Sequence, residues 1–330
     1  MVPRQKEALA VTTPAALETS SRIEHFPIGY FGMSMGLFGF ALALRAAGFP
    51  VASHVGMWVG LAAFVVLAAM LILKATLYTS ALVAEWHHPV RIAFFPATTI
   101  SLLLFAALIH HDAPGIATVV WIVGAVGQGV LTVVVVSAWI SHRAFGPGHL
   151  SPAWFIPAVG NVVVPLAGAP LGYEEACWYF FAVGIVFWLV LLTIIFNRLI
   201  FHDPIPERLR PTLVILIAPP AVAFVSWIQL HSGALDDTAR VLINAGYFFT
   251  AVVLVQLPSL LRLPFSLPFW ALSFPLAAIT VASFRFADLT GSAVHKTFGY
   301  VLLIVLAIAI VGLLLRTIRA VWAGEICRPE

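Results

Sequence analysis

The ionisable side chains of this sequence avoid its long apolar stretches, which limits the chemistry available there. Between residues 26 and 322, every acidic residue falls in a polar connection or at the end of an apolar stretch. They are Glu85, Asp112, Glu174, Glu175, Asp203, Glu207, Asp236, Asp237 and Asp288. A proton relay or an acidic ring that selects cations needs a carboxylate inside a span. The sequence therefore weighs against a proton-driven antiporter and a cation channel.

The histidine and cysteine residues do not predict a metal site or a disulfide. The pairs His87–His88 and His110–His111 invite a metal or haem site, but adjacent helical residues point about 100° apart and the topology below separates the pairs. That topology also separates Cys177 from Cys327, which excludes a disulfide within the chain. Because there is also no glycine-rich phosphate loop and no serine elbow, we expect no cofactor, no metal and no enzymatic activity.

The amino-acid composition indicates a membrane protein. The 330 residues are 62% hydrophobic and 9% charged, with a mean hydropathy of +1.03, whereas a soluble domain is about 25% charged. The apolar stretches run unbroken for about 18 residues or more, which favours membrane-spanning helices over a barrel. The net charge of +3 is spread between these stretches, so nucleic-acid binding is not expected. The sequence predicts an all-α integral membrane protein whose surroundings are the lipid bilayer.

Ten apolar stretches predict ten transmembrane helices, at about 26–47, 54–83, 91–109, 115–141, 152–172, 176–201, 211–230, 239–261, 266–286 and 295–322. Assigned to alternate faces, the Lys and Arg residues divide thirteen to four, and the positive-inside rule then places both termini in the cytoplasm. The smaller group is Arg45, Arg240, Arg285 and Lys296. We expect a tail at 1–25, a membrane domain at 26–322 and a second tail at 323–330, without a removable signal peptide.

Proline distinguishes the odd-numbered spans from the even ones. The predicted kinks are Pro27, Pro96, Pro165, Pro219 and Pro275. Because broken helices are tolerated at membrane depth only where protein or cavity water satisfies the freed groups, the odd spans should face inward. The repeat is then a helical hairpin, present five times in a ring, with the odd helices around a central pore. Small and polar residues of the odd spans are the pore-lining candidates, namely Gly36, Thr98, Asn161, Ser226, Ser273, Ala277 and Ala278.

Phe274 precedes the proline of the ninth span and is the candidate gate. Ala271, Ala277 and Ala278 lie about one helical turn away, which leaves room for the ring to swing aside. The alternative is a buried core phenylalanine. Each deep proline also deprives the carbonyl four residues earlier of its amide partner. Those carbonyls belong to Ile92, Asn161, Ile215 and Ala271.

Three segments resemble signature stretches of the tellurite-resistance/C4-dicarboxylate transporter family, which includes bacterial TehA and the slow anion channels of plant guard cells. They are FPIGYFGMSMGL (26–37), WFIPAVGNVVVPLAG (154–168) and FWALSFPLAA (269–278). The resemblance implies a homotrimer with one pore per protomer, occlusion by a phenylalanine that matches Phe274, and weak selectivity among small monovalent anions. It therefore points to an anion channel, for chloride or nitrate, in a bacterial inner membrane.

Two other functions are open at this stage. The chain could be a carrier or exporter of C4-dicarboxylates, sulfite or tellurite oxyanions that works by alternating access. Against this, doubly charged substrates usually need fixed cations inside, whereas basic residues of the spans such as Arg45 and Arg198 lie toward the span ends. The chain could also be a membrane sensor or assembly subunit that transports nothing, and its interior would then be packed without a continuous path.

Overall fold

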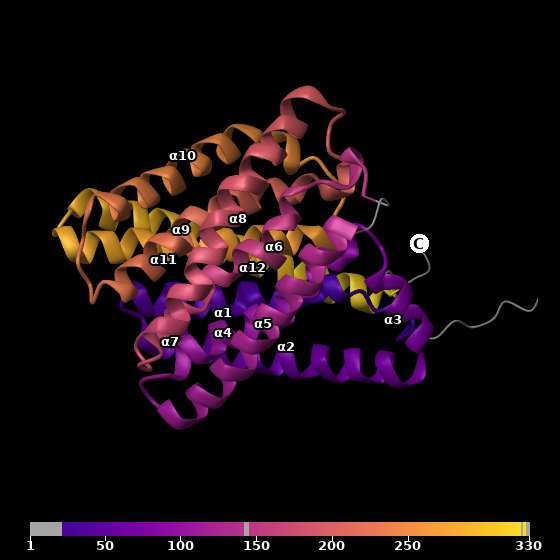
Figure 1. Cartoon of the computed structure of the whole chain (residues 1–330), viewed down its shortest axis with the longest axis horizontal. Coiled ribbons are helices and arrows are strands. Elements are labelled where there is room, and N and C mark those ends of the chain that lie inside the picture. Colours follow the sequence, from indigo (N-terminus) through magenta and orange to yellow (C-terminus); the bar gives the residue numbers. More distant parts are fainter. Residues whose placement is uncertain (1–21, 142–144, 325, 328–330) are drawn as a thin grey trace, which may run out of the picture.

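The computed structural model describes residues 22–141, 145–324 and 326–327. In this part of the chain, nine helical segments are long and apolar enough to cross a membrane. A shorter apolar segment, Pro152–Gly168, lies between the fourth and fifth of them (Figure 1). Counted together these are the ten predicted spans, so the helical membrane fold is confirmed.

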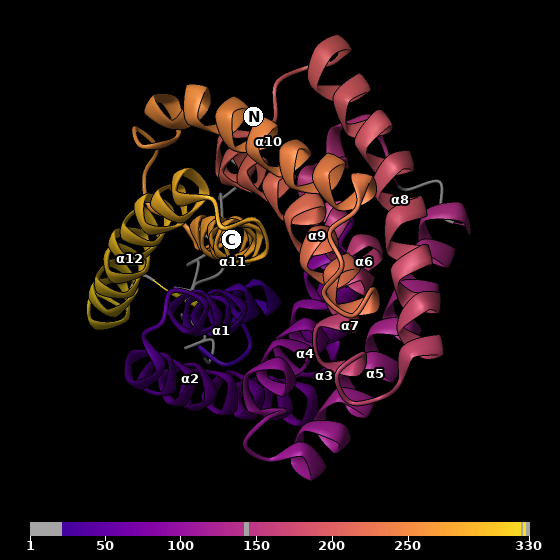
Figure 2. The ribbon, with the colours of Figure 1, turned by 90° about the vertical axis from the view of Figure 1, so that its left-hand side faces the viewer.

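The even-numbered spans are single long α-helices. They are α2 (Pro50–Leu77), α5 (Pro114–Ser141), α8 (Glu174–Phe201), α10 (Asp237–Leu260) and α12 (Ala293–Trp322). In their most apolar stretches only 17% to 33% of the residues are buried, against 61% to 78% in the four long odd-numbered spans. Figure 2 shows the long helices surrounding the others. The odd spans therefore form an inner ring, as the proline pattern predicted.

The odd-numbered spans change helix type along their length. Four of them start as a 3-10 helix and continue as an α-helix: η1 (Ile28–Tyr30) with α1 (Phe31–Ala46), η2 (Arg91–Phe94) with α4 (Ala97–Ile109), η6 (Glu207–Ile217) with α9 (Ala218–Leu230), and η7 (Leu267–Leu272) with α11 (Ser273–Thr290). The fifth span is more broken, and consists of η4 (Pro152–Trp154), α6 (Phe155–Val159), η5 (Gly160–Val163) and α7 (Pro165–Gly168). The short helices α3 (Thr79–Trp86) and η3 (Pro147–His149) lie in connections.

The predicted kink prolines lie at these changes of helix type. Pro96 is the N-cap of α4, Pro165 is the first residue of α7, and Pro219 and Pro275 are in the first turns of α9 and α11. Pro27 precedes η1 at the start of the first span. A proline has no N–H to donate and fits best in the first turn of an α-helix. Each deep proline therefore begins an α-helix inside its span.

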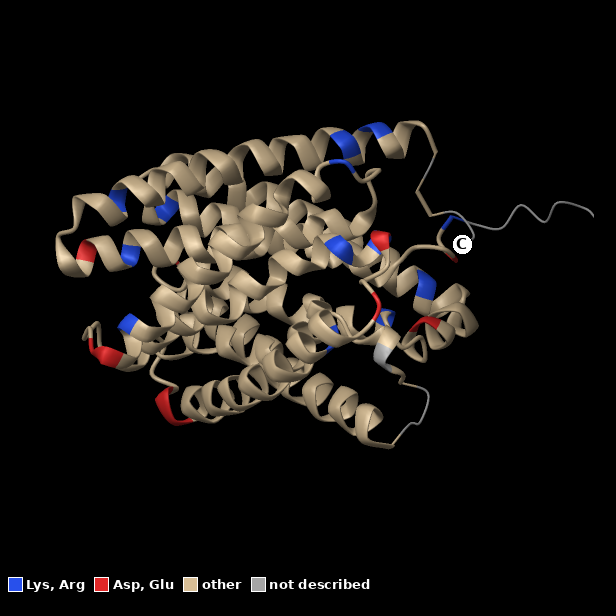
Figure 3. Cartoon of the chain, turned by 90° about the horizontal axis from the view of Figure 1, so that it is seen from above, with Lys and Arg blue, Asp and Glu red and all other residues tan. Residues whose placement is uncertain are grey.

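The two ends of the membrane domain lie on the same side of the bundle. Gly324, which follows α12, lies beside the guanidinium of Arg22. A β-carbon added to Gly324 would be 2.8 Å from Arg22 Nη2. Charged residues gather toward the two ends of the bundle (Figure 3). Most of both predicted tails lies outside the described residues, as do Arg4, Lys6, Arg143 and Arg328.

A buried ion pair secures the start of the first inner span. Lys74 of α2 and Glu85 of α3 are each 3% exposed, and Lys74 Nζ lies 2.6 Å from Glu85 Oε2. Nζ also donates to the Phe26 carbonyl at 2.7 Å, and Glu85 Oε1 accepts from the Ile28 N–H at 2.8 Å. Both charges thus fix the backbone that leads into η1.

Candidate functional site

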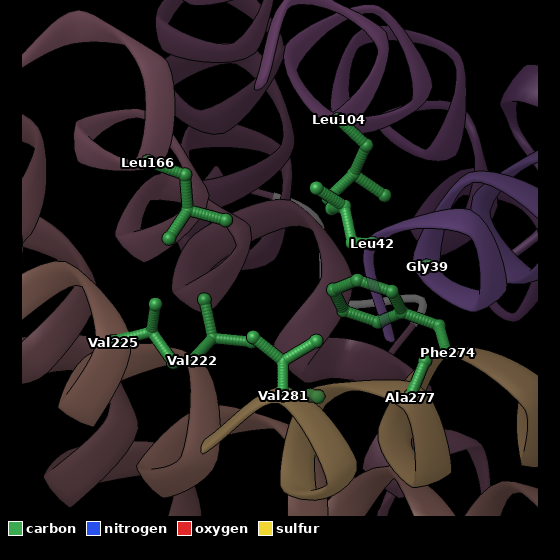
Figure 4. Close-up of a pocket in the computed structure, with 10 residues that line it drawn as sticks. Gly39, Leu42, Leu104, Leu166, Val222, Val225, Phe274, Ala277 and Val281 are labelled. Carbon is green, nitrogen blue, oxygen red and sulfur yellow. The ribbon is translucent and has the colours of Figure 1, made fainter. Parts of the chain in front are cut away.

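The five inner spans enclose two small cavities. The first has a volume of about 30 Å³, and all five spans contribute to its wall (Figure 4). Its lining residues are Gly39, Leu42, Leu104, Leu166, Val222, Val225, Phe274, Ala277, Ala278 and Val281. The wall is apolar throughout, so it provides no fixed charge to hold a solute.

The second cavity, of about 40 Å³, is also lined by all five inner spans. Its lining residues are Met35, Ile100, Phe155, Ile156, Val159, Gly160, Val162, Val163, Ile215, Ala218, Pro219, Val222 and Phe274. Each cavity has room for only a few water molecules.

Phe274 and Val222 line both cavities. Phe274 is half-buried although it lies among the inner helices. Figure 4 shows its ring reaching into the space between Leu42 and Val281, with Ala277 next to it on α11. Phe274, the gate proposed from the sequence, is therefore one of the two residues shared by the cavity walls.

The predicted pore-lining residues divide into two groups. Ala277 and Ala278 line the first cavity. Gly36 instead packs against Ser273, so closely that a β-carbon on the glycine would overlap Ser273 Oγ. Ser273 Oγ donates to the Trp270 carbonyl at 2.6 Å, and Thr98 Oγ1 donates to the Phe95 carbonyl at 2.8 Å. These three residues are not among those that line either cavity.

Asn161 and Ser226 also make hydrogen bonds within the protein. Asn161 Nδ2 donates to the Ala158 carbonyl at 2.7 Å and to Thr132 Oγ1 at 2.9 Å. Ser226 Oγ donates to the Val162 carbonyl at 2.5 Å. In an apolar interior a polar side chain needs such a partner. Neither residue is part of the cavity walls.

Three of the four carbonyls freed by the deep prolines accept from other donors. The Ile92 carbonyl accepts from Phe95 N at 3.4 Å, the Asn161 carbonyl from Val164 N at 3.2 Å, and the Ile215 carbonyl from the Ala218 N–H. Each bond joins residues three apart, which is the 3-10 pattern. The short 3-10 helices thus satisfy carbonyls that an α-helix would leave free before a proline.

Sequence reasoning missed most of the cavity wall because it searched for small and polar residues. Leu42, Leu104, Leu166, Val225 and Val281 carry no signal that separates them from lipid-facing residues. It also missed Gln128 and Thr132 of α5, which are buried and bond to the fifth span. An amide in the middle of an apolar stretch was the available signal for Gln128.

Histidines of both pairs bond to backbone carbonyls, His87 Nδ1 to Val83 and His110 Nδ1 to Ala107. The rings of His110 and His111 are tilted by 40°, with 3.9 Å between their centroids. Within residues 22–141, 145–324 and 326–327, no three His, Cys, Asp or Glu side chains gather as metal ligands would.

Comparison with known proteins identifies the family. The family model "SLAC1: Voltage-dependent anion channel" matches residues 25–318. The S-type anion channel SLAH3 of Arabidopsis thaliana is 28% identical over 89% of this chain and 48% of its own length. The guard cell S-type anion channel SLAC1 of the same plant is 26% identical over 80% of this chain and 50% of its own length. This chain thus spans about half the length of these plant relatives.

A bacterial relative covers more of its own length. The tellurite resistance protein TehA homolog of Haemophilus influenzae is 27% identical over 79% of this chain and 81% of that protein. The names of these relatives describe channels or a resistance protein rather than enzymes. Because the family model matches well over half of the chain, this protein belongs to the SLAC1 voltage-dependent anion channel family.

Proposed function

We propose that this protein is an anion channel that passes small monovalent anions such as chloride and nitrate, and that Phe274 closes it. The observation that carries the proposal is the position of Phe274, which lines both cavities enclosed by the five inner spans. We expect removal of this ring to enlarge both cavities at once. Membership of a family described as anion channels supports the nature of the solute.

The apolar cavity walls disfavour multiply charged ions. An ion in an apolar environment loses its hydration without compensation. This cost is smallest for an ion of single charge that gives up its water easily. A dianion would need fixed cations along the path, which the cavity walls do not provide.

We also propose a bacterial inner membrane, cytoplasmic termini and a homotrimer with one pore per protomer. The thirteen-to-four division of basic residues supports the orientation. The exposed apolar residues of the even helices, such as Val126 and Ile304, suit contact with lipid or with a second copy. A pore within each protomer is consistent with cavities lined by one chain.

Current recording on the parent protein and Phe274→Ala, in liposomes with ion substitution, tests the function. We expect little current from the parent and a large current from Phe274→Ala, with a reversal potential that follows the chloride gradient. Leu276→Ala is the matched control because Leu276 is on the same helix and lines neither cavity. Equal conductance in parent and Phe274→Ala contradicts the gate, and no current from either favours a subunit that transports nothing.

The second candidate is a carrier or exporter of C4-dicarboxylate, sulfite or tellurite oxyanions. The observation that favours it is the name of the Haemophilus influenzae relative, a tellurite resistance protein. Saturable counterflow of labelled malate or sulfite, without single-channel events in Phe274→Ala, would support the carrier over the channel.

A further inference from the structure

The fifth inner span is broken into four short helices within Pro152–Gly168. Each break leaves backbone carbonyls without an α-helical amide partner. In ion-conducting proteins, carbonyls freed in this way commonly turn into the pathway and coordinate cations. The direction of these carbonyls therefore bears on the sign of the ion that this pathway accepts.

Two side chains of the outer helix α5 bind the Pro157 carbonyl. Gln128 Nε2 donates to it at 3.1 Å, and Thr132 Oγ1 lies 2.7 Å from it and also 2.7 Å from the Gln128 carbonyl, so the hydroxyl hydrogen is shared between the two carbonyls. Because a carbonyl can only accept, the NH₂ group of the Gln128 amide must face Pro157. The other end of the amide, Oε1, accepts from Thr99 Oγ1 at 2.7 Å. Gln128 is completely buried, so this arrangement is fixed by the protein alone.

Three further carbonyls of the same span accept from side chains. The Ala158 carbonyl accepts from Asn161 Nδ2, and the Val162 carbonyl accepts from Ser226 Oγ of α9. The Val164 carbonyl accepts from Trp121 Nε1 of α5 at 2.9 Å. Donors from two neighbouring helices and from the span itself thus bind the carbonyls around its breaks.

Most of the bonded carbonyls of this span belong to residues outside the cavity wall. Phe155, Ile156, Val159, Gly160, Val162 and Val163 line the second cavity. Pro157, Ala158 and Asn161 do not, and their hydrogen bonds run toward α5 or within the span. Gln128 therefore binds the carbonyl of a residue outside the cavity wall, whereas Ser226 occupies the carbonyl of Val162, a residue of the wall.

We propose that Gln128, Thr132 and Ser226 are selectivity-determining residues, which exclude cations by making the carbonyls of the broken fifth span unavailable to ions in the pathway. The proposal rests on the anion channel function proposed above. None of the three side chains touches the passing ion. They act by donating hydrogen bonds to backbone carbonyl oxygens of the fifth span. Without these donors, the carbonyl oxygens would be free to bind water in the cavity and to attract a cation.

The test measures the chloride-to-potassium permeability ratio from reversal potentials in a potassium chloride gradient. The variants Gln128→Leu, Thr132→Val and Ser226→Ala are made in the open Phe274→Ala protein. We expect the ratio to fall about three- to ten-fold, the factor that corresponds to one hydrogen bond. Thr132→Ser keeps the hydroxyl and should keep the ratio.

Thr193→Val is the matched control for Thr132→Val. Thr193 is exposed on α8 and its hydroxyl donates to Leu189 of the same helix. Unchanged ratios in donor variants that conduct would overturn the proposal, as would failure of all three to assemble, since the donors would then serve folding alone. If Phe274→Ala alone passes no anions, the proposed channel function is wrong. That outcome differs from unchanged permeability ratios in conducting variants, which would contradict only the selectivity proposal.

Discussion

Gly39 of α1 lies directly against Phe274 of α11. A β-carbon at position 39 would be 3.4 Å from Cδ2 of Phe274 and 2.9 Å from Cβ of Ala277. The second distance is shorter than side chains tolerate, so α1 and α11 approach this closely only because residue 39 is glycine. One inner helix thus limits the space behind the ring that lines both cavities.

The effect of Gly39→Ala on the anion current should depend on the size of residue 274. The added methyl group presses on Ala277 and on the ring edge, and overpacking of this kind costs about 1–3 kcal/mol. In a Phe274→Leu background, we expect Gly39→Ala to lower the anion current severalfold, because residue 274 is pushed into the pathway. In a Phe274→Ala background the current should hardly change. Current recordings on the four proteins form a double-mutant cycle.

Gly312→Ala is the control for this cycle, because a β-carbon at Gly312 would meet nothing within 4 Å. Equal effects of Gly39→Ala in both backgrounds would show that the glycine serves helix packing and does not act through residue 274.

Loss of either charge of the Lys74–Glu85 pair should destabilise the membrane domain strongly. The partner left behind is buried without compensation, which costs about 3–5 kcal/mol. Lys74→Met and Glu85→Leu should each lower the midpoint of thermal unfolding in detergent. The double variant should be more stable than either single one, because it leaves no unpaired charge. The matched control, Arg262→Met, removes an exposed charge and should change little. Additive losses in the double variant would contradict the pairing.

The parts of the fold that sequence predicts are those with a local cause. Span length follows from an uninterrupted apolar stretch, and the inner position of the odd spans follows from prolines such as Pro96 and Pro219 that break helices. The partners of polar groups are different, because they depend on which helices meet. Ser226 was a pore-lining candidate, yet its hydroxyl bonds to Val162, 64 residues earlier.

The same limit applies to charges at span ends. Glu85 falls at a span end as predicted, but its burial depends on contact with the segment around Phe26 and Ile28, almost 60 residues earlier in the chain. Nothing near Glu85 in the sequence indicates that contact. The apolar cavity wall escaped prediction for a related reason, since Val222 differs from a lipid-facing valine only in what surrounds it.

Asp236 should make stability depend on pH in the acidic range. It caps α10 by accepting from Ala239 N at 2.8 Å, and this backbone hydrogen bond holds the pKa of the carboxyl below its usual value. A pKa lowered by folding stabilises the protein above the unfolded-state pKa of about 3.9. That contribution is lost as the pH falls through the lower, folded-state pKa. Thermal unfolding in detergent measured from pH 7 to below pH 4 should show the loss.

Asp236→Ala should flatten this part of the pH profile and lower stability at neutral pH, because the cap is removed. Asp236→Asn keeps a cap acceptor without the titration, so it should flatten the profile with less loss. If both variants retain the acid-dependent loss of the parent, other carboxylates are responsible.

The two cysteines provide a direct test of orientation. Cys177 is completely buried at the start of α8, where its sulfur lies near Gly168, so it should react slowly from either side. Cys327 is partly exposed, and burial raises the pKa of its thiol, with opposition from Arg22. Since the thiolate is the reactive form, a membrane-impermeant maleimide should label Cys327 slowly at neutral pH and faster as the pH rises above the usual value of about 8.5.

With cytoplasmic termini, Cys327 should be labelled in inside-out vesicles and protected in intact cells. Cys327→Ser should abolish that signal. Asp112→Cys, added to Cys327→Ser, should reverse the pattern, because Asp112 is exposed in the connection between α4 and α5, on the face with few basic residues. Labelling of Cys327 from outside, together with labelling of Asp112→Cys from inside, would invert the topology. The basic excess would then line the external mouth of the pathway, and the orientation drawn from the positive-inside rule would be wrong.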